Sequence, residues 1–182
     1  ALNFSCLHKL GVIFVIQDNG WAISVPVKDQ TAGGNIAKTA SGYEGLCVFD
    51  VDGCDYEAMS AAMKAAVARG RAGFGPSLIV AHVPRIGAHS SSDDPTKYKD
   101  AECALEERSR DPLPRFEAWL QDQGIIQPHE LEALKARLFQ EVEEAAVAAE
   151  AIPFPKRESA KTKVFKEVDA SQFLPFIEED SP

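Results

Sequence analysis

The sequence predicts an α/β fold in which a mostly parallel sheet is followed by C-terminal helices. Residues 12–16 form an apolar run that is rich in β-branched side chains and too short for a helix, which is typical of a strand buried on both faces. Residues 46–51, 56–69 and 77–83 read as a strand, a helix and a strand, and this order predicts a parallel pair with a right-handed crossover. At 182 residues, the chain is long enough for a substantial hydrophobic core.

The first predicted strand ends abruptly in a polar turn made of Gln17, Asp18, Asn19 and Gly20. Ligands of open α/β sheets bind beyond the carboxyl ends of the strands, so Asp18 and Asn19 are placed where a ligand or a metal ion would lie. An ordinary exit from a strand explains the same residues, since Asn and Gly favour turns. This stretch alone therefore leaves both interpretations open.

The helices predicted in the middle of the chain have clear caps. Asn35 can cap a short helix that runs through Ser41, and Asp55 is a good N-cap for the helix at residues 56–69. Apolar side chains recur along one face of that longer helix, so we expect this face to pack against the sheet. They belong to Met59, Met63, Ala66 and Val67.

The strand predicted at residues 77–83 ends in a second polar loop, residues 84–94. Parallel strands have their carboxyl ends at the same edge of a sheet, so the two polar exits can converge on one ligand. This convergence indicates a binding site more strongly than either exit does alone.

From Asp100 onward the pattern is helical. Pro112 and Pro114 open a helix that ends near Gly124, and Pro128 fits the first turn of the next one. Its apolar stripe favours a helix packed on a neighbour over a free coiled coil; the stripe contains Leu131, Leu134, Leu138, Val142, Ala145 and Ala149. We divide the chain into an α/β domain, residues 1–110, and a helical extension with an acidic tail, residues 111–182.

Composition argues against several classes of function. The formal net charge is −9, whereas nucleic-acid binding requires basic patches. No apolar run approaches the length of a membrane span, so we expect no membrane partner. The 4 cysteines are scattered without zinc-binding spacing, which favours reduced thiols in an intracellular protein.

Three segments resemble the α subunit of thiamine-diphosphate-dependent 2-oxo acid dehydrogenases. Residues 1–26, which end in GVIFVIQDNGWAISVP, resemble the second half of the family's cofactor motif, which opens with Gly-Asp-Gly and closes with two asparagines. Residues 85–94, RIGAHSSSDD, resemble its arginine–histidine–serine–aspartate loop, and residues 111–115, DPLPR, resemble the start of its C-terminal helices. The pair Asp93-Asp94 is closer to the branched-chain type than to the pyruvate type.

The resemblance covers only half of the cofactor motif. The closing pair reads Asp18-Asn19, so the first asparagine is replaced and the second is kept. The opening Gly-Asp-Gly would fall before Ala1. We therefore expect this chain to be the C-terminal part of a longer α subunit, with a thiamine-diphosphate-binding fold that is incomplete at its N-terminus.

The resemblance implies that thiamine diphosphate is bound through Mg²⁺, a hard cation that prefers oxygen ligands. By position, the metal ligands in this chain are the side-chain oxygen of Asn19 and the main-chain carbonyl of Trp21, whose side chain is not implicated. Ile23 matches an apolar residue that lines the cofactor. The cofactor performs the carbanion chemistry, and the protein orients it.

Two residues of the second loop have chemistry that suits this site. Arg85 carries a planar cation that fits a phosphate, or a carboxylate such as that of Asp93 or Asp94. His89 can donate a hydrogen bond to the diphosphate or a proton during acyl transfer, because an ordinary histidine titrates near neutral pH. Taken alone, His89 would be an ordinary loop histidine; the surrounding resemblance favours a catalytic and cofactor-binding role.

The implied function is the decarboxylating component of a 2-oxo acid dehydrogenase complex. It would oxidatively decarboxylate a branched-chain 2-oxo acid and transfer the acyl group to a lipoyl carrier. The implied partners are the β subunit, in an αβ or α₂β₂ assembly, and the lipoyl-bearing acyltransferase component. We expect the chain to be inactive without the β subunit and the upstream residues, and to act in the bacterial cytoplasm or the mitochondrial matrix.

Two alternatives stay open. One is the α subunit of a pyruvate or acetoin dehydrogenase. The other is a truncated module that serves only assembly, which the absent Gly-Asp-Gly favours.

Overall fold

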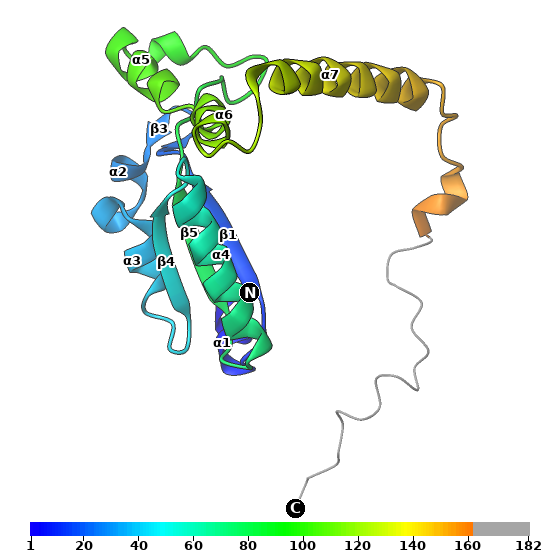
Figure 1. The fold of residues 1–182 in the computed structure, drawn as a ribbon. Helices are drawn as coiled ribbons and strands as arrows, with labels where there is room; N and C mark the ends of the chain where they lie inside the picture. The colour runs from blue at the N-terminus through cyan, green and yellow to red at the C-terminus, as the bar shows by residue number, and fades with distance from the viewer. Residues whose placement is uncertain (162–182) are drawn as a thin grey trace, which may run out of the picture. The chain divides into compact units, whose positions relative to one another are not determined.

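A three-stranded parallel sheet forms the centre of the fold in our computed structural model, which describes residues 1–161 (Figure 1). Its strands are β1 (Ile13–Asp18), β4 (Cys47–Asp52) and β5 (Ser77–His82), in the order β1-β5-β4. Helix α4 (Tyr56–Arg71) connects β4 to β5. The predicted parallel α/β fold, with its strand–helix–strand unit, is therefore confirmed.

Both faces of the sheet are covered by helices. Helix α3 (Ile36–Ala40) packs Ala37 and Ala40 against Leu78 and Val80 on one face. On the other face, α4 packs Ala62 and Ala66 against Ile79. Met59 and Met63 lie at the border of this second cluster, as the predicted stripe requires.

The strand β1 differs from its prediction, because it is not buried on both faces. Val15, in its middle, is 47% exposed. The fully buried strand is β5, in which Leu78, Ile79 and Val80 are at most 1% exposed. The order of the strands explains the difference, since β5 has a strand on each side whereas β1 lies at an edge of the sheet.

The predicted helix caps are confirmed. The Asn35 side chain accepts a hydrogen bond from the backbone N–H of Lys38, and the Asp55 side chain accepts one from Ala58. Each bond satisfies a backbone donor that has no partner within the helix.

Besides the elements described above, the chain contains several further short strands and helices. A small hairpin, β2 (Trp21–Ala22) and β3 (Val25–Pro26), follows β1 directly. Helix α5 (Ala101–Ser109) precedes the predicted α6 (Pro112–Asp122) and is capped by Asp100. The remaining short elements are α1 (Leu2–Leu7), α2 (Val27–Gln30), η1 (Ala32–Gly34), η2 (Pro95–Lys97) and η3 (Arg157–Lys161).

The chain divides into two compact units, residues 1–131 and 132–182, and helix α7 (Pro128–Glu150) contains the division. The domain boundary that we predict after residue 110 stays a prediction. In α7 the stripe is buried at Leu131, whereas Leu138 and Val142 are exposed within the second unit, and the expectation that the whole stripe packs on a neighbour stays a prediction. Most of the predicted acidic tail lies outside the described residues.

Within residues 1–161, no helix combines the length and the apolar character needed to cross a membrane. All four cysteines lie in this part and are free thiols.

Candidate functional site

The polar turn after β1 is held by its own side chains. The Asp18 carboxylate accepts a hydrogen bond from the N–H of Gly20 at 3.0 Å, and the side-chain oxygen of Asn19 accepts one from the N–H of Trp21 at 3.1 Å. Gly20 has a φ of 75°, which favours glycine. An amide oxygen has two lone pairs, so the Asn19 oxygen can still bind a ligand with the second one.

The main-chain carbonyl of Trp21 is not used by the β2–β3 hairpin. Val27 donates its N–H to the carbonyl of Gly20 at 2.8 Å, and the next pair along the ladder is Trp21 with Pro26. Hydrogen-bonded and non-bonded pairs alternate in antiparallel ladders, and proline has no N–H to donate. The hairpin ladder therefore leaves the Trp21 carbonyl available, two residues along the chain from Asn19.

The tip of this hairpin is strained. Ile23 has a φ of 57°, which is an outlier for a β-branched residue, and its side chain is 55% exposed. Its carbonyl accepts a hydrogen bond from the Arg85 guanidinium, Nη1 to O, at 2.5 Å. Strain of this kind persists only where the surroundings enforce it, and Arg85 supplies the enforcing contact.

Arg85 also connects the hairpin to the loop after β5. Its Nη2 donates to the Tyr98 hydroxyl at 2.6 Å, and that hydroxyl donates to the Asp93 carboxylate at 2.6 Å. The guanidinium lies 5.5 Å from the centre of the Trp21 ring and 5.4 Å from that of Tyr98. Arg85 thus reaches Asp93 through Tyr98, and both of its terminal nitrogens bind within the chain.

These contacts shift the pKa values of two side chains in the loop, Asp93 and Tyr98. The hydrogen bond from Tyr98, followed by that from the His89 N–H, lowers the pKa of Asp93. Desolvation, and then the bond to Asp93, raises the pKa of Tyr98. Asp93 is therefore a carboxylate and Tyr98 a neutral hydroxyl donor across the physiological range.

Beneath the Trp21 ring lies a buried ion pair. The ammonium of Lys99 is 2.5 Å from the carboxylate of Glu107, and their side chains are 4% and 15% exposed. The other oxygen of Glu107 accepts the indole N–H of Trp21 at 3.2 Å. Lys99 also donates to the carbonyl of Arg85 at 2.9 Å.

His89 lies in the exposed part of the same loop. Its backbone N–H donates to the Asp93 carboxylate at 2.8 Å, so the residue is tied to the Arg85 network through its main chain. The imidazole is thus carried by an anchored backbone at the carboxyl edge of the sheet. That its side chain faces the same crevice as Asn19 stays a prediction, as does its role.

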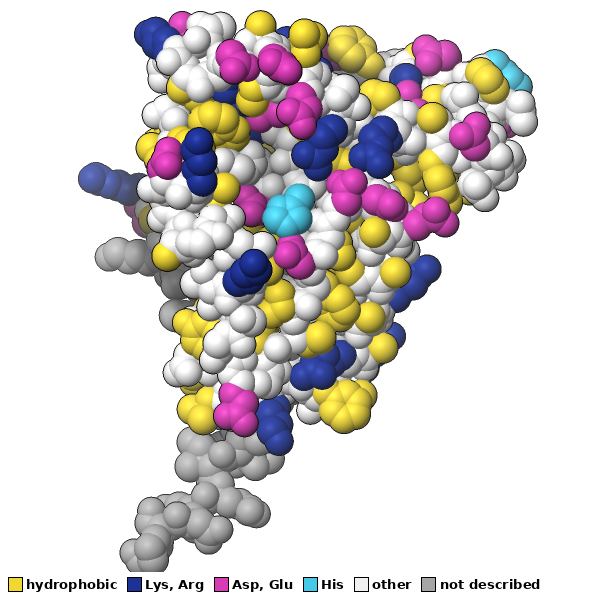
Figure 2. Space-filling view, turned by 90° about the vertical axis from the view of Figure 1, so that its left-hand side faces the viewer, with side chains coloured by type: hydrophobic (Ala, Val, Ile, Leu, Met, Phe, Trp, Pro, Cys, Tyr) yellow, Lys and Arg dark blue, Asp and Glu magenta, His cyan; other side chains and the backbone are white. Residues whose placement is uncertain are grey.

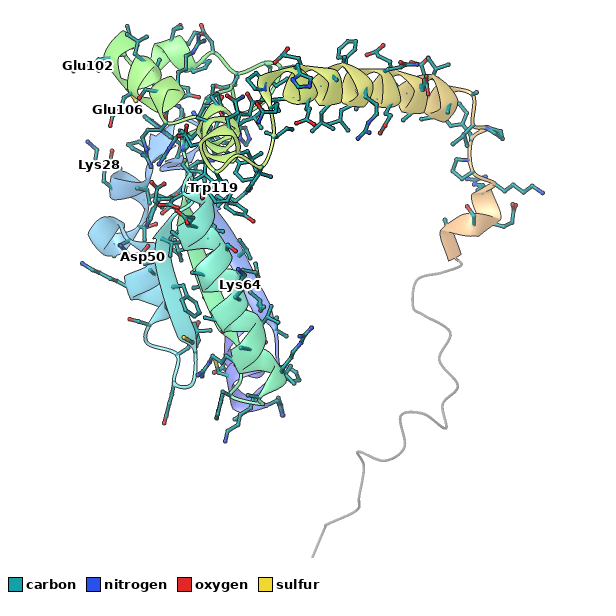
Figure 3. The ribbon with its side chains drawn as sticks, in the orientation of Figure 1. Lys28, Asp50, Lys64, Glu102, Glu106 and Trp119 are labelled. Carbon is teal, nitrogen blue, oxygen red and sulfur yellow. The ribbon has the colours of Figure 1, made fainter. Side chains whose placement is uncertain are left out.

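His82 is a member of this edge that the sequence analysis does not single out. It ends β5 in register with Asp18 of β1, and its imidazole lies 3.7 Å from the Asp18 carboxylate and 2.5 Å from that of Asp50. Asp50 lies toward the upper end of β4 (Figure 3). Figure 2 shows acidic and basic side chains gathered around a histidine on the face that it draws. The imidazole at the end of β5 therefore contacts side chains of both neighbouring strands, β1 and β4.

A separate polar cluster lies at the end of β4. The Asp52 carboxylate accepts the N–H of Cys54 at 2.9 Å and lies 3.7 Å from Arg110 and 3.5 Å from Arg115. The backbone bond is the main cause that lowers the pKa of Asp52. Burial, with Asp52 nearby, raises the pKa of the Cys54 thiol, which therefore stays protonated and unreactive.

The oxygens beside Trp21 match a hard divalent cation in type but not in number. Side-chain amide and backbone carbonyl oxygens are ligands that Mg²⁺ accepts. Among the described residues, however, no group of three or more His, Cys, Asp or Glu side chains could hold a metal ion. Asn19 and Trp21 can thus supply part of an octahedral set, and a ligand or further residues must supply the rest.

Comparison with known proteins identifies the family. The family described as "Dehydrogenase E1 component" matches residues 1–158. The chain belongs to this family. The E1 dehydrogenases depend on thiamine diphosphate, so the resemblance seen in the sequence is confirmed.

Several relatives of this E1 chain are α subunits. The 3-methyl-2-oxobutanoate dehydrogenase subunit alpha of Mycobacterium tuberculosis is 44% identical over 137 residues, which are 75% of this chain and 37% of the relative. The 2-oxoisovalerate dehydrogenase subunit alpha of Bacillus subtilis is 37% identical over 163 residues, 90% of this chain and 49% of the relative. The Bacillus subtilis pyruvate dehydrogenase E1 component subunit alpha is 38% identical over 157 residues, which are 86% of this chain and 42% of the relative. The E1 chain spans about half the length of these relatives or less.

The structure brings together most of the residues that the sequence singles out. Arg85 contacts both Trp21 and Ile23, and Asn19 lies in the turn that holds Trp21. Glu107 is a site residue that sequence reasoning misses, because it is 86 positions from Trp21 and lies in a helix with no distinctive pattern. His82 could be found from the strand register, since it pairs with Asp18.

Proposed function

We propose that this E1 chain is the cofactor-binding part of an α subunit that oxidatively decarboxylates a branched-chain 2-oxo acid and passes the acyl group to a lipoyl carrier. The observation that carries the proposal is the pair of oxygens from Asn19 and Trp21 at the carboxyl edge of the sheet, beside the loop of Arg85 and His89. The family supports the cofactor, since its members depend on thiamine diphosphate.

In this proposal, Asn19 and Trp21 supply two neutral oxygens to a Mg²⁺ ion that binds the diphosphate. The remaining protein ligands of this Mg²⁺ ion come from residues other than Asn19 and Trp21. Ile23 presents an apolar side chain from a strained turn, which fixes its direction, and it would pack against the cofactor. When bound, thiamine diphosphate supplies the carbanion chemistry of decarboxylation.

His89 and Arg85 have separate tasks. His89 is exposed and carried by a main chain anchored to Asp93, so its imidazole can hold or donate a proton at the reacting group. Arg85 uses its two terminal nitrogens to hold the Ile23 turn and Tyr98. Its contribution is therefore to the shape of the site and to its positive potential.

The substrate and partners follow from the relatives. Two of them are named for 3-methyl-2-oxobutanoate or 2-oxoisovalerate, which favours a branched-chain substrate. The name subunit alpha supports pairing with a β subunit, in an αβ or α₂β₂ assembly, and delivery of the acyl group to a lipoyl-bearing acyltransferase. The relatives above come from bacteria, so we propose that the enzyme acts in the bacterial cytoplasm.

The test uses the full-length α subunit with its β subunit, thiamine diphosphate and Mg²⁺. We expect kcat/KM for 3-methyl-2-oxobutanoate to exceed that for pyruvate by at least about tenfold, since one or two methylene groups in a fitted pocket change selectivity by ~10–200-fold each. A preference for pyruvate would instead support a pyruvate dehydrogenase. No turnover of any 2-oxo acid by a correctly assembled enzyme would support the assembly module.

A further inference from the structure

The indole of Trp21 is held by several contacts within the candidate site. Two cations lie over its ring, with the Lys99 ammonium 5.1 Å and the Arg85 guanidinium 5.5 Å from the ring centre. Tyr98 packs against it at 5.3 Å. Cations are attracted to the faces of an indole ring, so the contacts with Lys99 and Arg85 both stabilise its position.

The orientation of that ring is set by one hydrogen bond. Glu107 accepts the indole N–H with one carboxylate oxygen and binds Lys99 with the other. An indole has a single donor, which lies on one edge of the ring, so an acceptor there selects one rotation of the side chain. Hydrogen bonds to charged groups are the stronger kind, and this one is largely screened from water.

The same residue carries the turn at which the ligand oxygens lie. The N–H of Trp21 is bound by Asn19, and its carbonyl is the one that the hairpin ladder leaves available. A side chain fixed in rotation restricts the φ and ψ of its own residue. Anchoring the indole therefore restricts the directions of the Asn19 and Trp21 oxygens.

We infer that Glu107 is a positioning residue that acts through the indole of Trp21 to fix the turn of residues 18–21. The use of that turn in binding Mg²⁺ and thiamine diphosphate rests on the proposed function. In this arrangement, α5 holds the site from 86 residues away along the chain. Lys99, which also binds the Arg85 carbonyl, joins the same anchor to the loop after β5.

Trp21→Phe tests the anchor with the smallest change, since it removes the indole N–H and keeps an aromatic ring beside the two cations. Trp119→Phe is the matched control, because the N–H of Trp119 is buried without a hydrogen-bond partner in the described part of the chain (Figure 3). The double variant Glu107→Leu/Lys99→Met removes the acceptor without leaving a buried cation unpaired. Glu106→Gln, on the exposed side of α5, controls for changes to that helix (Figure 3).

The main readout is amide hydrogen exchange in the full-length protein assembled with its partner subunit. In Trp21→Phe and in Glu107→Leu/Lys99→Met, we expect the amides of residues 19–22 to exchange about tenfold faster, while those of β5 stay unchanged. The two control variants should match the wild type in both segments. Equal acceleration in β5 would reveal a general stabilising role, and no acceleration at residues 19–22 in either variant would show that the anchor does not hold the turn; either result overturns the inference.

Calorimetric titration with thiamine diphosphate and Mg²⁺ separates this inference from the proposed function. We expect both test variants to bind about tenfold more weakly than the wild type. A wild-type assembly that does not bind the cofactor would refute the proposed function, and hydrogen exchange would still decide whether Glu107 fixes the turn. Unchanged affinity in variants whose turn has loosened would show that Glu107 does not position the ligand oxygens.

Discussion

At the residue scale, the side-chain oxygen of Asn19 has one partner in the chain and room for a second. It accepts the N–H of Trp21 at 3.1 Å, which leaves a lone pair for a cation. We expect Asn19→Ala to weaken Mg²⁺-dependent binding of thiamine diphosphate by about tenfold or more, because it removes one of roughly six ligands. Calorimetry on the assembled enzyme measures the affinity, and an unchanged value would mean that Asn19 is not a ligand.

His89 is the residue whose loss should affect turnover without affecting the fold. Its side chain is exposed and only its main chain is used by the Asp93 carboxylate. We expect His89→Ala to lower turnover by roughly a hundredfold, the usual scale for a positioned acid or base, while the melting temperature stays within about 1 °C. Near-normal turnover, or activity lost only together with the fold, would contradict the assignment. Ser91→Ala, two positions along the same exposed stretch, is the control.

Asp93 gives the loop a defined dependence on pH. Its pKa is lowered by Tyr98 and by the His89 N–H, so the folded loop favours the carboxylate. The stabilising effect is fully present above the ordinary carboxyl value of about 3.9 and is lost as the pH falls through the lower pKa of the folded loop. We expect residues 85–98 to keep their hydrogen-exchange protection down to about pH 4, after correction for intrinsic rates, and to lose it below that value.

Asp93→Asn should lower the hydrogen-exchange protection of residues 85–98 at neutral pH, as acid does in the wild type. The reason is that an amide cannot supply the same charged acceptor to Tyr98. Asp94→Asn is the matched control, since Asp94 binds Thr96 rather than the Arg85 network. If both variants behaved alike, the Arg85–Tyr98–Asp93 connection would not be what holds the loop.

At the scale of elements, the glycine with the least room for a side chain is Gly53, where β4 turns toward α4. A Cβ on Gly53 would lie 2.5 Å from the Val83 side chain and 3.0 Å from the His82 carbonyl. We expect Gly53→Ala to lower the free energy of unfolding by about 1–3 kcal/mol, because the β4 and β5 ends would have to separate. Gly42→Ala, whose Cβ would meet only one atom at 3.9 Å, should change it by no more than about 0.5 kcal/mol.

Denaturant unfolding of the full-length protein measures both variants. Equal effects of the two substitutions would show that the turn at Gly53 adapts to a side chain. A loss of stability at Gly53 alone would support the close contact between the strand exits.

At the scale of the whole molecule, α7 has apolar side chains that are exposed within its own unit. Leu138 is 45% and Val142 65% exposed, and they lie one turn apart on the same face. Apolar patches of this kind mark contacts between chains. We expect the full-length protein to form an αβ or α₂β₂ assembly, and Leu138→Gln/Val142→Gln to weaken that assembly by about tenfold or more.

Light scattering and sedimentation measure the mass of the assembly. Glu143→Gln is the control, since it changes a charged side chain on the same helix. A well-behaved monomer of the wild-type protein, or an assembly that tolerates both apolar substitutions, would contradict the prediction.

The sequence by itself determined the parts of this protein that depend on neighbouring residues. The caps at Asn35 and Asp55 act within three residues, and the strand–helix–strand unit follows from local periodicity. The polar turn at Asp18 and Asn19 is also local, because its hydrogen bonds span two residues. Such features need no knowledge of the rest of the chain.

Only the tertiary structure decided which strand is central and which side chains meet. Apolar runs predict strands but not their order, and so β5, rather than β1, proved to be the buried strand. Arg85 meets the Ile23 carbonyl across 62 positions, and Glu107 meets the Trp21 indole across 86. No local pattern records such pairs, because they arise only after the crossover through α4 has brought the strand exits to one edge and the following loop and α5 have folded beside them.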